Sequence, residues 1–333
     1  MTAAVAVDLG KTGCRAVLWN GDDGGPQEIR EVPGAPGLAA GNGVATARAA
    51  VLAAVLPLLE REPSPRPAAV CVGAAGAASA PEAARALAGL LLEDLPTEEV
   101  AVTSDAVTAH AGALGGDTGV VLAIGTGSVA IGIGDDGSYA RVDGWGPWLG
   151  DEGSGAWIGA AGLRAALRAH DGRGPDTALL SAAVERFGDP DRLPLAVGRD
   201  GNPARTAASF APDVARLAAA GDAAASTIVR DAATVLGEAV LAAARRIAGD
   251  ALSVTVTGGL TGLGEPLLGP VRSALHGFPR PLRLRSPLGN PLDGARLLAL
   301  DALAPHEPHV VRVRRAAPFF TVPTPPVTPP AIG

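Results

Sequence analysis

Short runs of β-branched and small apolar residues alternate along the chain with longer stretches rich in alanine and leucine. The short runs are typical of buried strands, and the longer ones of helices that pack on a sheet. In the first third of the chain, strands are predicted at 3–8, 14–19, 27–32, 68–72 and 100–103, with a turn at 21–26. Helices are predicted between and after the later strands, at 43–60, 81–92 and 108–114. This order predicts a mixed sheet with helices on its faces.

The same order of elements begins again at Gly119, with a strand, a tight glycine turn, a second strand, a polar turn and a third strand. Further helices are predicted at 163–170, 177–187, 204–220 and 223–248, followed by a strand at 252–257 and a last helix at 291–303. The repetition predicts two domains, residues 1–114 and 115–290. The helix within 291–304 is expected to pack back on the N-terminal domain.

The end of the chain has a different composition from the rest. Residues 305–333 are rich in proline, and we expect them to form a tail that is disordered or bound to the surface. His306 and His309 lie in this tail and show no spacing of metal ligands, so we expect both imidazoles to be solvated.

Two glycine-containing turns each join a pair of predicted strands, D-L-G-K-T at 8–12 and I-G-T-G-S at 124–128. A turn of this kind presents backbone N–H groups and a hydroxyl at its tip. Two such turns that face each other across a cleft can bind the phosphates of a nucleotide. No Walker motif and no G-x-G-x-x-G opening a helix occurs in the chain. A nucleotide is therefore expected between hairpins rather than at the N-terminus of a helix.

Charge and cysteine content narrow the class of protein. The 333 residues carry a net charge of −7 without a basic stripe, which argues against binding to nucleic acid or to an anionic membrane. No apolar run is long enough to span a bilayer, and no secretory leader is recognisable, so a cytoplasmic protein is expected. Cys14 and Cys71 lie in apolar runs, and without a C-x-x-C motif they are expected to be buried thiols.

Two aspartates follow predicted strands and are candidates for chemistry. Asp105 lies between a strand and a helix, where a carboxylate acts either as a general base or as a helix N-cap, a role that Ser104 can also fill. Asp8 ends the first strand, where it either contributes to a Mg²⁺ site or forms the turn.

Taken together, these motifs resemble the actin- and hexokinase-containing superfamily, and more narrowly the family of N-acetylglucosamine kinases and BadF/BadG/BcrA/BcrD ATPases. The G-W-G-P-W-L-G-D-E-G-S-G-A-W-I-G block is the most specific of them. The segments that carry the resemblance are residues 8–12, 103–106, 124–128, 144–159, 211–215, 220–225 and 257–259. It implies an α/β protein of two actin-like (ribonuclease H-like) domains, each a mixed sheet flanked by helices, with the active site in the interdomain cleft.

The resemblance also implies roles for the nucleotide site. Asp105 is the expected catalytic base, and Asp8 the residue that holds Mg²⁺ through water. The phosphates of ATP would be bound by Gly10, Lys11, Thr12, Gly125, Thr126, Gly127 and Ser128, and its adenosine by Gly258 and Gly259. Lys11 replaces a glycine that is common in the family, and its side chain either reaches a phosphate or points to solvent.

For the sugar, the resemblance implies a second set of contacts. The expected binding residues are Asp105, Gly127, Trp145, Asp151, Glu152 and Gly155. A carboxylate that accepts two vicinal hydroxyls would orient the ring. Asp151 is alternatively a cap of the helix that begins near Ser154, and Trp157 serves equally well as core packing.

The chain departs from the family on the sugar side. Val129 replaces an asparagine that contacts the sugar in animal members. The polar side chains that those members use elsewhere are also missing, because residues 34–43 contain only Asn42 as a polar residue and residues 72–78 contain none. We therefore expect an ATP- and Mg²⁺-dependent kinase that phosphorylates N-acetylglucosamine or glucosamine at O6, as a homodimer with a small-molecule sugar as substrate. The alternatives are an ATP-binding regulator and an electron-activator ATPase of the BadF type, which needs two cysteines near its dimer face.

Overall fold

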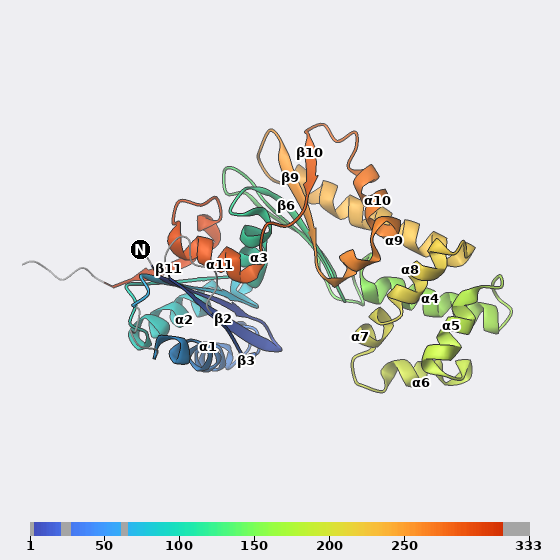
Figure 1. The fold of residues 1–333 in the computed structure, drawn as a ribbon, viewed down its shortest axis with the longest axis horizontal. Coiled ribbons are helices and arrows are strands. Elements are labelled where there is room, and N and C mark those ends of the chain that lie inside the picture. The colour runs from blue at the N-terminus through green and yellow to red at the C-terminus, as the bar shows by residue number, and fades with distance from the viewer. Residues whose placement is uncertain (1–2, 21–27, 61–65, 316–333) are drawn as a thin grey trace, which may run out of the picture.

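The computed structural model describes residues 3–20, 28–60 and 66–315. These residues form two sheets with helices on their faces, which lie side by side in Figure 1. Both sheets contain parallel and antiparallel pairs, so the predicted α/β class with mixed sheets is confirmed. The predicted turn at 21–26 and the part of the tail at 316–333 lie outside the described residues. Within them, no helix combines the length and the apolar character that a bilayer crossing requires.

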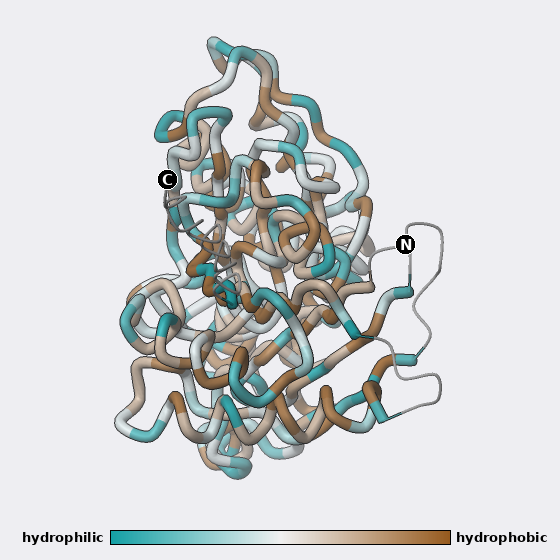
Figure 2. Tube along the Cα trace, turned by 90° about the vertical axis from the view of Figure 1, so that its left-hand side faces the viewer, coloured by the Kyte–Doolittle hydropathy of each residue, from teal (hydrophilic) through white to brown (hydrophobic). Residues whose placement is uncertain are grey.

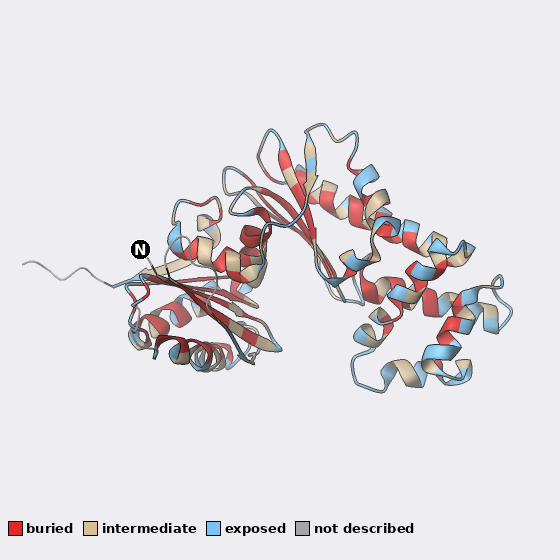
Figure 3. Cartoon of the chain, viewed as in Figure 1, coloured by how far each residue is buried: buried red, intermediate tan, exposed pale blue. Residues whose placement is uncertain are grey.

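The first sheet has six strands in the order β11-β5-β4-β1-β2-β3. Their bounds are β1 Ala4–Leu9, β2 Gly13–Trp19, β3 Ile29–Pro33, β4 Ala69–Ala74, β5 Glu99–Thr103 and β11 Val311–Arg314. Helices α1 (Gly43–Leu59) and α2 (Pro81–Asp94) cover one face, and α3 (Asp105–Leu114) and α11 (Pro291–Leu300) cover the other. The two central strands, β4 and β1, are buried on both faces (Figure 3).

Alternation along β1 explains how both faces are covered. Val5 and Val7 belong to the apolar cluster under α1 and α2, whereas Ala4 and Ala6 belong to the cluster under α3 and α11. Successive side chains of a strand point to opposite faces, so this strand supplies large residues to one layer and small residues to the other. Figure 2 shows hydrophobic and hydrophilic residues interspersed along the chain.

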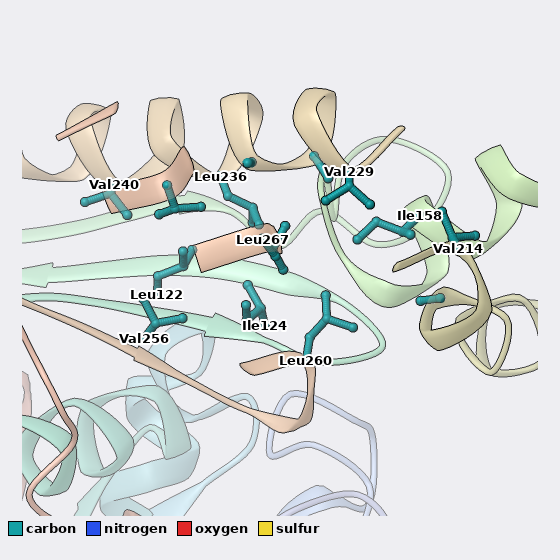
Figure 4. Packing of buried hydrophobic residues seen from close by; sticks show 14 of the residues in the cluster. Leu122, Ile124, Ile158, Val214, Val229, Leu236, Val240, Val256, Leu260 and Leu267 are labelled. Carbon is teal, nitrogen blue, oxygen red and sulfur yellow. The ribbon is translucent and has the colours of Figure 1, made fainter. Parts of the chain in front are cut away.

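The second sheet has five strands in the order β10-β9-β6-β7-β8. Their bounds are β6 Gly119–Ile124, β7 Ser128–Ile133, β8 Tyr139–Asp143, β9 Leu252–Thr257 and β10 Leu282–Arg285. The helices of this half are α4 Gly155–His170, α5 Ala178–Phe187, α6 Leu193–Gly198, α7 Pro203–Ala208, α8 Ala211–Ala219, α9 Ala223–Arg245 and α10 Glu265–Ala274. Its core packs Leu122 and Ile124 of β6 against Leu236 of α9 and Leu267 of α10 (Figure 4).

Several predicted helix bounds differ from the structure. The helix expected at 204–220 is two helices, α7 and α8, and the one expected at 163–170 begins eight residues earlier, at Gly155. This start agrees with the helix expected to begin near Ser154, whereas Gly159 weakens the helical pattern between Gly155 and Leu163. A Cβ atom built on Gly159 would lie 1.8 Å from the carbonyl oxygen of Ala207, so close packing of α4 on α7 requires glycine here. Helix α10 and strand β10 were not predicted.

The expected tail was wrong for residues 305–315, which belong to the fold. Strand β11 pairs antiparallel with β5 and extends the first sheet. Arg312 of β11 is buried and forms ion pairs with Glu99 of β5 and with Glu307. Val311 and Val313 alternate with arginines along the strand, as is typical of an edge strand, and the surrounding prolines hid this pattern in the composition.

The expectation that His306 is solvated was also wrong. Its side chain is completely buried, and its Nε2 lies 2.9 Å from Nδ1 of His110 on α3. Nε2 of His110 in turn lies 3.0 Å from the carbonyl oxygen of Gly119 at the start of β6. The pair therefore joins the C-terminal segment to the point where the chain passes from the first sheet to the second. His309 is partly buried, and its Nε2 lies 2.9 Å from the carbonyl oxygen of Gly137.

Candidate active site

A cavity of about 690 Å³, which we call the cleft, lies between the two sheets. The carboxyl end of β1, the N-terminus of α3 and the turn between β6 and β7 contribute to its wall. Its lining includes Asp8, Ser79, Ser104, Asp105, Gly125, Gly127, Ser128, Val129, Tyr139, Arg141, Asp151 and Gly258. Seven of the residues expected at the site therefore share one cavity, although they come from distant parts of the chain.

Asp105 is the first residue of α3, and its carboxylate lines the cleft. The N-cap of the helix is Ser104, whose Oγ accepts a hydrogen bond from the N–H of Val107 at 3.2 Å. Capping is thus performed by the serine. Burial raises the pKa of the Asp105 carboxyl, the negative charge of Asp8 raises it further, and the hydrogen bond from the N–H of Ala106 opposes both. A raised pKa brings a carboxylate closer to the basicity that proton abstraction needs.

Asp8 lies near the end of β1 and carries the second carboxylate of the cleft. Its Oδ2 is 2.5 Å from an Nη atom of Arg15 on β2, a partner that the sequence did not reveal. In the described part of the chain, no group of three or more acidic, histidine or cysteine side chains forms a ready metal site. Mg²⁺ at a nucleotide needs only one or two carboxylates, because water and phosphate supply the remaining ligands. Asp8 fits that requirement.

The turn after β1 is held by its own backbone and by the segment after β3. The N–H of Gly10 donates to the carbonyl oxygen of Gly13 at 2.9 Å, and the carbonyl oxygen of Gly10 accepts from Ala35. Lys11 and Thr12 are exposed and lie outside the lining of the cleft. The positive charge of Lys11 nevertheless lowers the pKa of Asp105, against the larger effect of burial.

The turn between β6 and β7 is fixed to the start of α4. The N–H groups of Gly155 and Ala156 donate to the carbonyl oxygens of Gly125 and Thr126, at 2.8 and 3.1 Å. Ser128 Oγ donates to the carbonyl oxygen of Glu152 at 2.7 Å. Gly155 is therefore buried beneath the turn and outside the lining of the cleft. The contact of Glu152 with this turn is made by its backbone, and its side chain is exposed.

Asp151 approaches the turn more closely than any larger residue at Gly127 would allow. A Cβ atom on Gly127 would lie 2.6 Å from Oδ2 of Asp151. Asp151 adopts φ 56°, a left-handed conformation that is uncommon outside glycine, and its Oδ1 accepts from the N–H of Gly146 at 3.2 Å. Burial raises the pKa of this carboxyl, and the charge of Asp143 adds to the effect. Ser154 caps α4, so the carboxylate of Asp151 remains directed at the cleft.

Asp143 is a residue that the sequence reasoning missed. It also has a positive φ, 62°, and its two carboxylate oxygens accept from the N–H groups of Asp151 and Glu152, each at 2.8 Å. Asp143 thus holds the turn of the long motif and orients Asp151. The only signal in the sequence is an aspartate before glycine at the end of a predicted strand, which is typical of many turns.

Two of the three tryptophans of the long motif are highly exposed. Trp145 is 66% exposed and Trp148 90% exposed. The guanidinium of Arg141, which lines the cleft, lies 5.0 Å from the centre of the Trp145 ring. Trp157 is partly buried and, with Trp148 and Asp151, borders a separate cavity of about 370 Å³.

Gly258 lies where the cleft meets another large cavity. Its φ is 97°, and a Cβ atom there would lie 2.3 Å from the carbonyl oxygen of Ile124, so the strand-to-helix turn requires glycine. The adjoining cavity has a volume of about 730 Å³ and is lined mainly by apolar residues of α3, β9 and α10, together with Arg272 and Arg285. Gly259 is exposed and outside both linings.

A family model described as the BadF/BadG/BcrA/BcrD ATPase family matches residues 5–267, and the chain belongs to this family, as its motifs predicted. A structure from Chromobacterium violaceum, provisionally named an N-acetylglucosamine kinase, is 30% identical with a TM-score of 0.66 and covers 90% of this chain and 99% of that one. A ROK family glucokinase from Streptomyces griseus, solved with glucose and AMPPNP, is 19% identical with a TM-score of 0.51 over 90% and 99% of the two chains. The predicted actin-like fold is thereby confirmed.

Two curated relatives match shorter segments. The N-acetylmuramic acid/N-acetylglucosamine kinase of Clostridium acetobutylicum is 31% identical over 116 residues, 33% of this chain and 36% of that protein. The N-acetyl-D-glucosamine kinase of Dictyostelium discoideum is 36% identical over 87 residues, 26% of this chain and 27% of that protein. The chain therefore matches about a third or less of the length of these two relatives.

Proposed function

We propose that this protein is a kinase that transfers the γ-phosphate of ATP to an amino sugar, N-acetylglucosamine or glucosamine, at O6. The observation that carries the proposal is the position of Asp105, a buried carboxylate of raised pKa in the same cleft as the glycine turn at 125–128. The names of the similar proteins, which are sugar kinases, support the same activity.

In this proposal Asp105 accepts the proton of the sugar hydroxyl as that oxygen attacks the γ-phosphate. Phosphoryl transfer depends mainly on positioning and charge stabilisation, so one well-placed carboxylate suffices. Asp151, oriented by Asp143, binds the ring hydroxyls from the opposite wall. The carboxylates of Asp105 and Asp151 thus hold the acceptor between them, and Gly127 leaves room for this arrangement.

The nucleotide would lie across the two glycine turns. Backbone N–H groups of 10–12 and 125–128 bind its phosphates, Lys11 adds a positive charge, and the apolar cavity beside Gly258 receives the adenosine. Mg²⁺ held by Asp8, when bound, neutralises charge on the phosphates. Closure of the two halves over the substrates would exclude water and suppress hydrolysis of ATP. The two domains are proposed to meet near residues 114–115, between the two sheets.

The test is an assay of ADP release with a panel of glucosamine, N-acetylglucosamine, N-acetylmannosamine and glucose, each with Mg-ATP. We expect the highest kcat/KM with glucosamine or N-acetylglucosamine, and a 6-phosphate product by NMR. A panel in which no sugar raises ADP release above the sugar-free rate would reject the kinase.

An electron-activator ATPase is the alternative within the same family, and the cysteines argue against it. Cys14 and Cys71 are both completely buried, on β2 and β4, two strands that β1 separates. Burial raises the pKa of each thiol to about 12, which disfavours the thiolate that an iron–sulfur cluster binds. Protein purified without oxygen is expected to show no visible absorbance from iron.

A further inference from the structure

The cavity of about 370 Å³ beside Trp157, which we call the outer cavity, shares one lining residue with the cleft. That residue is Asp151, whose carboxylate is proposed to bind the ring hydroxyls of the acceptor. The remaining wall of the outer cavity comes from the loop at 147–150, the first two turns of α4 and the segment at 197–207. The outer cavity is therefore the direct neighbour of the proposed acceptor site, on the far side of Asp151 from the cleft.

Two tryptophans line the outer cavity, although the chain contains few aromatic residues. Three of its four tryptophans lie within residues 145–157. Trp157 of α4 is partly buried, whereas Trp148 is almost fully exposed, as are Trp145 and Leu149 of the same loop to a large extent. Large apolar side chains that gather at the surface beside a cavity are typical of a surface that a ligand covers. An indole offers a flat apolar face, which suits the C–H face of a sugar ring.

The loop that carries Trp148 is closed by hydrogen bonds of its own. The N–H of Gly150 donates to the carbonyl oxygen of Gly146 at 2.9 Å, and the N–H of Gly146 donates to Oδ1 of Asp151 at 3.2 Å. Asp143 holds the backbone at the end of the loop. These bonds restrain the backbone on both sides of Trp148, so a ligand that packs on the indole orders little that is not already ordered.

The wall of the outer cavity also supplies polar groups that can donate hydrogen bonds. Arg164 of α4 forms no ion pair with any residue that the structure describes. Oδ1 of Asn202 accepts from the N–H of Arg205 at 3.1 Å, which leaves the amide NH₂ of Asn202 as a donor. Apolar ring faces combined with a few directed donors are the composition of a site for a neutral ring that carries hydroxyls.

We propose that the outer cavity is a subsite for a second sugar ring, joined by a glycosidic bond to the hexosamine in the cleft. This assignment rests on the proposed function. Its volume lies near the lower end of the range for small-molecule sites, which suits one ring and makes the preferred acceptor a disaccharide. The two rings would lie on either side of Asp151, whose two carboxylate oxygens can accept hydroxyls from both.

The test compares three acceptors with Mg-ATP: N-acetylglucosamine, its methyl β-glycoside and N,N′-diacetylchitobiose. Both rings of the disaccharide carry a free O6 hydroxyl, so either ring can occupy the cleft. We expect kcat/KM for the disaccharide to exceed that for N-acetylglucosamine about tenfold (~1.4 kcal/mol). The methyl glycoside has the linkage without the second ring and should react like the monosaccharide.

A pair of neighbouring substitutions assigns the gain to the outer cavity. Trp148→Ala should lower kcat/KM for the disaccharide to that of the monosaccharide and leave the monosaccharide value unchanged. The matched control is Leu149→Ala, because Leu149 is 85% exposed and lies outside the lining of the cavity. This control should keep the preference for the disaccharide. Equal preferences in the two variants would overturn the assignment.

A second measurement does not depend on turnover. Calorimetry without nucleotide should give the unmodified protein a lower Kd for N,N′-diacetylchitobiose than for N-acetylglucosamine, and Trp148→Ala similar Kd values for both. If the monosaccharide is phosphorylated but the disaccharide neither binds nor reacts better, the outer cavity is not a sugar subsite and the kinase assignment stands. If none of the three acceptors and no sugar of the earlier panel is phosphorylated, the proposed function fails and this subsite with it.

Discussion

At the scale of single residues, the structure places two carboxyl groups of raised pKa in one cleft and supports each with a neighbouring side chain. Ser104 caps α3, which leaves Asp105 free of that task. Asp143 binds the N–H groups beside Asp151, which fixes the left-handed backbone of that residue. Residues that sequence patterns would assign to turns and caps thus orient the residues proposed to contact substrate.

Replacement of Asp105 separates catalysis from stability. Asp105→Asn should lower kcat by about 10²- to 10⁴-fold, the usual contribution of a general base, and leave ATP affinity unchanged. Because burial raises the pKa of this carboxyl, its ionised form destabilises the fold at neutral pH, so the variant should unfold at the same or a higher temperature. Ser104→Ala should instead lose about 1 kcal/mol of stability with the cap. Full turnover by Asp105→Asn would contradict the assignment.

The glycine turn offers a matched pair of substitutions. Gly127→Ala introduces a methyl group 2.6 Å from Oδ2 of Asp151, and the displaced carboxylate should raise KM for the sugar by about tenfold or more. A Cβ atom on Gly125 meets nothing within 4 Å, so Gly125→Ala should leave the KM for sugar unchanged. Steady-state kinetics with the sugar varied at saturating ATP measures the difference. Equal effects on the KM for sugar would argue against a role for Asp151.

At the scale of elements, the C-terminal segment extends the first sheet at β5, the strand that leads to Ser104 and Asp105 in the cleft. Strand β11 pairs with β5, whose last residue, Thr103, precedes the cap Ser104 and the proposed base Asp105. The proline-rich composition favoured a tail, and the pairing of four residues with a distant strand decided otherwise. A strand that adds to the edge of an existing sheet needs few residues, because its partner is already in place.

Substitution of two arginines of β11 tests whether buried ion pairs anchor this strand. Arg312 is 8% exposed and forms ion pairs with Glu99 and Glu307, so Arg312→Met leaves two carboxylates without their buried partner and should cost about 3 kcal/mol. Arg314 also pairs with Glu99 but is 63% exposed, so Arg314→Met should cost at most about 1 kcal/mol. Urea denaturation gives both free energies of unfolding. Losses of equal size would show that β11 is not anchored through Arg312.

At the scale of the whole molecule, the two halves meet where α3, the start of β6 and the C-terminal segment come together. The buried pair of His110 and His306 occupies this junction, and in the described part of the chain Nδ1 of His306 is a buried nitrogen without a hydrogen-bond partner. Burial lowers the pKa of His306 to about 4 and that of His110 to about 3, so both imidazoles are neutral in the folded protein near pH 7.

This junction makes stability depend on pH. A histidine whose pKa is about 4 when folded and 6.5 when unfolded binds fewer protons in the folded state between these values, so stability falls as the pH drops below 6.5. For His306 alone, the loss between pH 6.5 and 5 should be about 2 kcal/mol. His306→Gln, whose amide can still donate to His110, should remove most of that loss. Urea denaturation at pH 7 and pH 5 measures it, and an unchanged pH dependence in the variant would contradict this account.

Much of the fold was predictable because strands and helices are local patterns. The strands near 4–9, 13–19, 119–124 and 252–257 have the apolar runs that β-sheets bury, and their tight glycine turns follow directly. The extra helices α6 and α10 were not predicted, because glycine and proline within them weaken the pattern. Asp143 and Tyr139 were missed for a different reason, since each has meaning only beside residues that the fold brings close.

The sequence by itself determined the two strand-and-turn units, the aspartates at the ends of strands and the family to which the chain belongs, because each depends on residues that are neighbours in the chain. The tertiary structure alone decided that these aspartates share a cleft and that the C-terminal segment extends the first sheet. Those features arise from contacts between segments far apart in the chain, which form when the apolar faces of the elements that carry them are buried.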